Sequence, residues 1–166
     1  MPEFYGNATD FRAYHLERGN AVDVDTDDAD INICLLVGSE WMDAQYREHL
    51  TGLKVGERSQ IREQPRTGQV DNYGYAIDVD TIPREYVHAT YEIAYKHLIT
   101  PGVLNEDYTP GKYDQVSVDG AISVKFTKFN SVAEIQTKFS KVGQIMATLV
   151  SDRSNLSSLS GRIART

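Results

Sequence analysis

Cysteine is nearly absent from this sequence, and so are several other features that would assign a function. Cys34 is the single cysteine among 166 residues, which excludes an intramolecular disulfide and agrees with a reducing compartment. No stretch approaches the ~20 apolar residues that a membrane span requires, so we expect no membrane contact. The first residues lack the basic and apolar regions of a signal peptide, which predicts a cytoplasmic protein.

Catalytic motifs are missing as well. The sequence has no glycine-rich phosphate loop, no G-x-S-x-G elbow and no H-E-x-x-H helix. The four histidines have no metal-ligand spacing, and the run Asp23-x-Asp25-x-Asp27 lacks the glycine and the glutamate that a calcium loop requires. We therefore expect no enzyme, no metal and no cofactor, and we interpret the acidic run as a solvated helix cap.

Charge is distributed unevenly along the chain. Residues 1–110 hold 9 basic and 20 acidic side chains, a balance of 9 − 20 = −11, whereas residues 111–166 hold 8 basic and 4 acidic ones, a balance of 8 − 4 = +4. The formal net charge of −7 argues against general binding to duplex DNA, which needs a concentrated basic face. An acidic body with a basic tail indicates two surfaces for two different neighbours.

Apolar periodicity predicts about four helices. A short one covers residues 10–18, with Thr9 as N-cap, and a long one runs from a cap at Thr26 or Asp27 to near residue 52. The third begins with Pro83 at its first position and ends at residues 100–102, and the last extends from the capping box Ser131-x-x-Glu134 to about residue 150. Residues 53–81 carry no helical period and are expected to form a long loop with a short extended piece.

Residues 113–126 alternate in the way that is typical of a β-hairpin. A two-residue turn at Asp119-Gly120 would put the apolar residues of the two strands on opposite faces. A three-residue loop, 119–121, would pair Val118 with Ile122 and put all of them on one face, so we favour it. A lone hairpin is marginal in water, so this face must pack either on the helices or on a neighbouring subunit. The expected contact residues are Val116, Val118, Ile122, Val124 and Phe126.

The last sixteen residues are rich in serine and contain no regular helical stripe. One interpretation is a solvated, disordered end. The other is an arm, 151–166, that becomes ordered on a partner, because three apolar side chains stand among three arginines. The expected contact residues of this arm are Arg153, Leu156, Leu159, Arg162, Ile163 and Arg165.

Several short motifs occur in an order that is similar to a family of tailed-bacteriophage proteins. They are TDFRAYHLERGN from Thr9, WMDAQY in the long helix, QPRTG at 64–68, the turn at 71–74, Ile82-Pro83, ATYEIAY at 89–95 and the hairpin. The chain resembles the head–tail connector, or adaptor, proteins, some of which are labelled DnaT-like single-stranded DNA-binding proteins. The resemblance covers roughly residues 8–150. One departure is Gln64, where family members often have an aromatic residue.

The resemblance implies a mainly α fold: a small helical bundle of about four helices, 1–150, with a β-hairpin insertion and an extended C-terminal arm. Such proteins form a ring, expected to be dodecameric, on the portal of the capsid. They are virion proteins assembled in the host cytoplasm. The arm would bind the portal protein, and the hairpin would contact a neighbouring subunit or the next tail component. DNA would only pass through. The alternative is a single-stranded DNA-binding accessory protein of replication, which would need a basic groove with exposed aromatic side chains.

Overall fold

The fold is mainly helical, as the sequence predicts, with one antiparallel two-stranded hairpin. The computed structural model describes residues 3–104, 115–118, 122–125 and 139–150. Its four α-helices are α1 (Ala8–Leu16), α2 (Asp28–Tyr46), α3 (Arg84–Ile99) and α5 (Ser140–Met146). Short strands β1 (Leu53–Lys54) and β2 (Arg66–Thr67) flank a 3₁₀ turn, η1 (Glu57–Ser59), and the hairpin consists of β3 (Gln115–Val118) and β4 (Ile122–Lys125). Within these residues, no helix has the length and apolar character that crossing a membrane demands.

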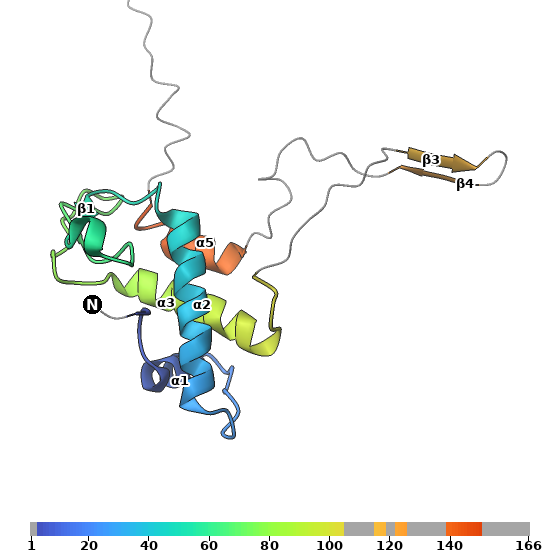
Figure 1. Cartoon of the computed structure of the whole chain (residues 1–166), viewed down its shortest axis with the longest axis horizontal. Helices are drawn as coiled ribbons and strands as arrows, with labels where there is room; N and C mark the ends of the chain where they lie inside the picture. The colour runs from blue at the N-terminus through green and yellow to red at the C-terminus, as the bar shows by residue number, and fades with distance from the viewer. Residues whose placement is uncertain (1–2, 105–114, 119–121, 126–138, 151–166) are drawn as a thin grey trace, which may run out of the picture.

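Helices α2 and α3 cross at the centre of the molecule and form its main contact (Figure 1). Asp27 caps α2 by accepting a hydrogen bond from the Ala29 amide, so the acidic run acts as a helix cap, as expected. A Cβ atom at Gly38 would lie 3.2 Å from the Ala94 nitrogen, so glycine lets the two helices approach closely. The prediction that α2 reaches residue 52 was wrong: Leu50 is buried but lies beyond the helix end.

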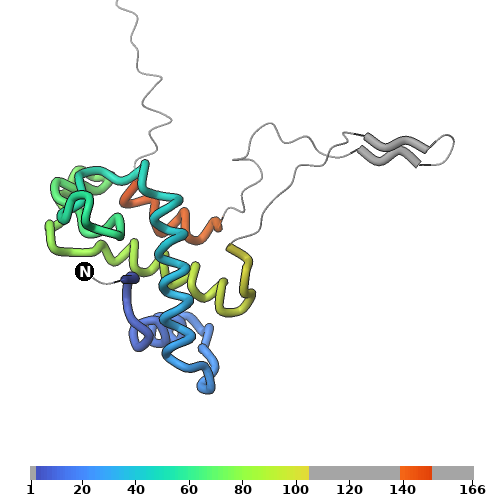
Figure 2. The backbone as a smooth tube through the Cα atoms, viewed as in Figure 1, coloured from blue at the N-terminus to red at the C-terminus, as the bar shows by residue number. Residues whose placement is uncertain are grey.

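Helix α1 lies against the N-terminal half of α2 and against α3 (Figure 2). Its N-cap is Asn7 rather than Thr9, because the Asn7 side chain accepts a hydrogen bond from the Asp10 amide at 2.9 Å. Its Phe11, Tyr14 and His15 share one face and are buried. It packs with the N-terminal half of α2 and with α3 in one core cluster.

A second core cluster joins the other half of α2 to α3 and α5, and it includes Tyr5, Met42, Tyr86 and Val142. Helix α5 and the residues that follow it supply buried Val142, Met146 and Leu149, three members of the predicted last stripe. The capping box at 131–134 lies outside the described residues. Pro83 occupies the N-cap position of α3, one residue before the predicted place.

The hairpin has the register that a three-residue loop predicts. Val118 pairs with Ile122 and Val116 with Val124, while Ser117 pairs with Ser123 and Gln115 with Lys125. Apolar residues are therefore registered with apolar ones, and polar residues with polar ones. Among the described helices and strands, β3 and β4 contact each other.

Candidate functional site

Segment 53–81 is the largest described part of the molecule that has little regular structure, and it is held in place by buried polar side chains. At its centre Asp43 of α2 accepts hydrogen bonds from the hydroxyls of Tyr5, at 2.6 Å, and Tyr86, at 3.0 Å. The Arg62 guanidinium lies 3.4 Å from the second carboxylate oxygen of Asp43. The same arginine donates to the backbone carbonyl of Glu3, so one side chain joins the loop, α2 and the N-terminal segment.

Burial sets the protonation behaviour of this cluster. Burial raises the pKa of Asp43. The hydrogen bonds from both tyrosines and the charge of Arg62 lower that pKa, because they favour the ionised carboxylate, but the effect of burial is larger. Burial, followed by the charge of Asp43, raises the pKa of Tyr5 and of Tyr86. Because each tyrosine donates to Asp43, both must be protonated for the cluster to form. We infer a structural cluster, since its polar atoms are already engaged with one another.

A second set of polar contacts fixes the start of the segment. Arg66 pairs with Glu63 at 2.9 Å and donates to the carbonyls of Thr51 and Gly52, and Lys54 pairs with the same Glu63 at 3.1 Å. The Gln60 side chain accepts from the Gly56 amide and donates to the carbonyls of Arg62 and Pro65. Side chains therefore bond backbone amides and carbonyls in and beside the loop that have no partner in a helix or a broad sheet.

The far end of the segment is joined to the end of α5. The Asn72 backbone amide donates to the Thr148 carbonyl at 2.9 Å, and the Asn72 side chain donates to the carbonyls of Ala147 and Val150. These bonds engage carbonyls at a helix C-terminus that have no partner within the helix. They also place the turn at 71–75, with Tyr73 and Tyr75 each 73% exposed, beside the point at which the predicted arm begins.

Apolar side chains are exposed along this anchored segment. Among the large hydrophobic residues that are exposed in the described part of the chain, seven of eleven lie between positions 53 and 79. We call these seven the loop surface: Leu53, Val55, Ile61, Val70, Tyr73, Tyr75 and Val79. Exposed apolar side chains indicate an interaction site where they gather into one patch. This surface is the candidate functional site.

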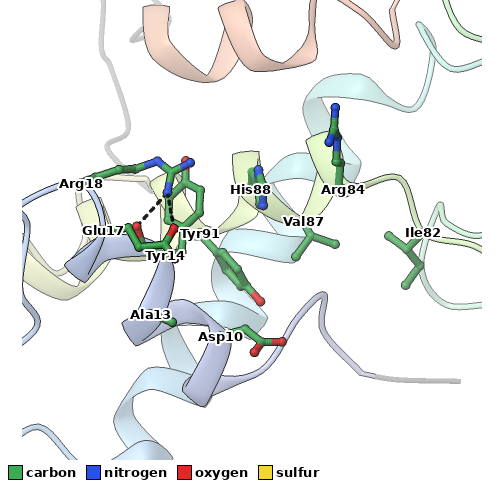
Figure 3. Close-up of a pocket in the computed structure, with 10 residues that line it drawn as sticks. All are labelled: Asp10, Ala13, Tyr14, Glu17, Arg18, Ile82, Arg84, Val87, His88 and Tyr91. Carbon is green, nitrogen blue, oxygen red and sulfur yellow. Dashed lines mark hydrogen bonds and ion pairs between the residues drawn. The ribbon is translucent and has the colours of Figure 1, made fainter.

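A pocket of about 410 Å³ lies between α1 and the start of α3 (Figure 3). Its lining includes acidic Asp10 and Glu17 and basic Arg18 and Arg84. Arg18 lies 3.5 Å above the Tyr14 ring and donates to the Tyr14 carbonyl, so its guanidinium is already engaged. Tyr14 and Tyr91 are almost fully buried and present no open ring face. We find no arrangement of nucleophile and base among these lining residues.

The sequence-predicted site residues are only partly covered by the described structure. The registers of Val116, Val118, Ile122 and Val124 agree with the predicted hairpin, whereas Phe126 and the arm residues lie outside the described residues. In the described part of the chain, no three His, Cys, Asp or Glu side chains form a group that could hold a metal ion. Cys34 is buried, and burial raises the pKa of its thiol.

Sequence reasoning missed the loop surface and the cluster beneath it. Asp43 lies within the long predicted helix, and its partners Tyr5, Arg62 and Tyr86 are 38, 19 and 43 residues away in sequence. The alternation at Tyr73, Tyr75, Ile77 and Val79 was a usable signal for an extended piece. It did not show which side chains would face solvent.

Comparison with known families assigns the chain to a single class. The family model described as "Putative DnaT-like ssDNA binding protein" matches residues 3–166, and the chain belongs to this family. No curated protein matches the chain, and no solved structure matches it. The match extends over the described body, the hairpin and the predicted arm.

Proposed function

We propose that the protein is a non-enzymatic adaptor of a bacteriophage head–tail connector, which forms a ring on the portal and a platform for the next tail component. The observation that carries this proposal is the charge of the described body. Residues 3–104 and 139–150 hold 10 basic and 18 acidic side chains, a balance of 10 − 18 = −8. Such a body repels nucleic acid and leaves partner binding to apolar surfaces and to the basic tail.

Most basic side chains of the body form ion pairs within it. Seven of the ten form ion pairs, including Arg12 with Asp28, Arg62 with Asp43 and Lys141 with Glu92. Cations used in this way do not make the open basic groove that a phosphate backbone requires. In a ring, an acidic inner wall would let DNA pass without adhering, because the charges are alike. In this proposal DNA is passing cargo rather than a ligand.

In this proposal, the contact with the portal comes from the C-terminal end of the chain. The arm, 151–166, is the portal-binding segment, with Leu156, Leu159 and Ile163 as anchors and its arginines pairing with carboxylates or carbonyls at the rim. Asn72 is hydrogen-bonded to the carbonyls of Ala147, Thr148 and Val150, the residues that precede the arm in the sequence. The protein acts in the virion, after assembly in the host cytoplasm. Alone, it is a monomer or a loose oligomer, because a net charge of −7 repels identical copies.

The second candidate function is single-stranded DNA binding in replication, and the description of the family favours it. This role needs basic side chains with exposed aromatic rings. In the described body, the two most exposed aromatic rings, Tyr73 and Tyr75, adjoin Asp71, and both amides donate to its carboxylate. A DNA strand would therefore have to rely on the basic residues of 111–166.

Two triple variants of the full chain distinguish the candidates. The first replaces Leu156, Leu159 and Ile163 by serine, and the second replaces Arg153, Arg162 and Arg165 by glutamine. For an adaptor, the serine variant loses co-sedimentation with the portal ring of the same phage, and neither the parent nor the variants bind oligonucleotides tightly. For the DNA-binding protein, the parent binds an oligonucleotide in a salt-dependent way, as measured by fluorescence anisotropy, and the glutamine variant loses this binding. Portal binding that survives the serine variant removes the arm from the proposal, and circular dichroism checks folding.

A further inference from the structure

Tyr91 of α3 holds both ends of α1. Its hydroxyl accepts a hydrogen bond at 3.4 Å from the amide of Asn7, the N-cap of α1. Its backbone carbonyl lies 3.1 Å from Nε2 of His15, in the last turn of α1. A carbonyl oxygen can only accept, so Nε2 carries a proton and donates it. His15 therefore bonds α1 directly to the backbone of α3.

The imidazole of His15 is enclosed by other rings and is fully buried. It stacks on Tyr95 with 4.3 Å between ring centroids and lies edge-on to Phe11 and Tyr14, at 4.6 and 5.0 Å. Nδ1, the second ring nitrogen, is buried and has no hydrogen-bond partner within the described residues. A second proton would place a positive charge and another N–H donor among aromatic side chains, which is costly. The site therefore favours the neutral imidazole.

The charged groups near this ring do not offset a second proton. Glu92 of α3 is the acidic one, but its carboxylate already accepts from the Tyr14 hydroxyl at 2.8 Å and pairs with Lys141 of α5 at 2.6 Å. Lys141 and Arg18 oppose another positive charge. From α2, the titratable member of the same core cluster is Cys34, and burial raises the pKa of its thiol, which keeps it neutral. Burial is the largest effect on the imidazole and lowers its pKa.

We propose that His15 is an acid-sensitive lock, which holds α1 and residues 3–7 on the body at neutral pH and releases them together in acid. A released imidazole binds a proton below a pH of about 6.5, whereas the buried imidazole excludes it. The contribution of His15 to the attachment of α1 is therefore complete above that pH and declines as the pH falls below it. This inference is independent of the proposed function.

The released part has a natural boundary. The link between α1 and α2, 17–27, contains no helix or strand, and none of its residues is buried, so α1 can separate while α2 stays folded. Residues 3–7 are continuous with α1 and move with it. Tyr5 then leaves Asp43, to which it donates a hydrogen bond at 2.6 Å in the closed form. One titrating side chain thus affects the packing of α1 and, through the chain, the polar cluster beneath segment 53–81.

The test is hydrogen exchange of the full chain at pH 7 and pH 5, followed by mass spectrometry and corrected for the pH dependence of chemical exchange. Excluding one proton shifts the opening equilibrium by up to about tenfold per pH unit below the pKa of the released imidazole. We expect protection of 8–16 to fall about tenfold more than protection of the centre of α2. His15→Gln cannot titrate but keeps a donor for the Tyr91 carbonyl, so this extra fall should disappear. His49→Gln is the matched control, because His49 is exposed, and should behave like the parent.

The same pH dependence of α1 protection in the parent and in His15→Gln would overturn the proposal. So would a parent in which α1 and α2 lose protection to the same extent, because the opening would then be global. If His15→Gln does not fold, an NMR titration of the labelled imidazole in the parent replaces it. A midpoint for His15 at or above the ordinary value of 6.5 overturns the lock, and a lower midpoint together with the selective loss of α1 protection supports it.

Discussion

The crossing pair α2–α3 and segment 53–81 are both well anchored, but by different physical means. The helices bury an apolar stripe, with Leu35, Ile93 and Ala94 inaccessible to solvent, and their backbones are bonded internally. Segment 53–81 has two-residue strands. Buried Gln60 bonds its backbone, and buried Arg62 and Arg66 join it to the carbonyls of Glu3 and Thr51. Because its interior is polar, its apolar side chains can face solvent. A fold stabilised in this way keeps a rigid apolar surface available for a partner.

The largest expected effect comes from removing the central cation of the loop. Arg62→Ala leaves the buried Asp43 carboxylate without a counter-charge and ends the bond to the Glu3 carbonyl. Breaking a buried pair from one side costs ~3–5 kcal/mol of unfolding free energy. Urea unfolding would measure it, with Arg58→Ala as the control because Arg58 is exposed on η1. Equal midpoints for the two variants would mean that the segment is not anchored by this pair.

The helical pair should respond to an apolar truncation instead. Leu35 is fully buried in the cluster that joins α1, α2 and α3. Leu35→Ala removes buried methyl groups and leaves a cavity, which costs ~2–5 kcal/mol. No titratable group is deleted, so the loss should be the same at pH 6 and pH 8 in thermal and urea unfolding. A loss that varied strongly between these pH values would show that the two regions are coupled.

Much of the helical pair could be predicted from the sequence, whereas most of the loop could not. The stripe from Ile31 to Met42 repeats at threes and fours, so its buried face follows from local periodicity. The hairpin register also follows from the alternation of apolar residues, which requires a loop with an odd number of residues. The Asp43 cluster depends on contacts between residues far apart in sequence, which no local periodicity predicts. Which alternate residues of the loop face solvent depends on those same contacts.

The hydroxyl of Tyr86 gives the loop cluster a dependence on alkaline pH. Tyr86→Phe removes a hydrogen bond to a buried carboxylate and should cost ~1.5–3 kcal/mol at pH 7. The folded-state pKa of Tyr86 is raised above 10.0, so its contribution is complete below pH 10 and declines above it, because the unfolded tyrosine then loses its proton. The stability difference between parent and variant should therefore shrink from pH 9 to pH 11. A constant difference in denaturant unfolding at these pH values would contradict the raised pKa.

The smallest expected effect is a gain, and it concerns Gln64. Its side chain is 2% exposed, and neither amide atom has a hydrogen-bond partner within the described residues. Gln64→Met keeps the length and removes the unpaired polar atoms, so it should add ~1–3 kcal/mol of stability. Gln60→Met is the matched control, because the Gln60 amide makes three hydrogen bonds to the loop backbone and its loss should destabilise. If both variants lose stability in thermal unfolding, the Gln64 amide is bonded in the folded protein, and the loop interior is polar throughout.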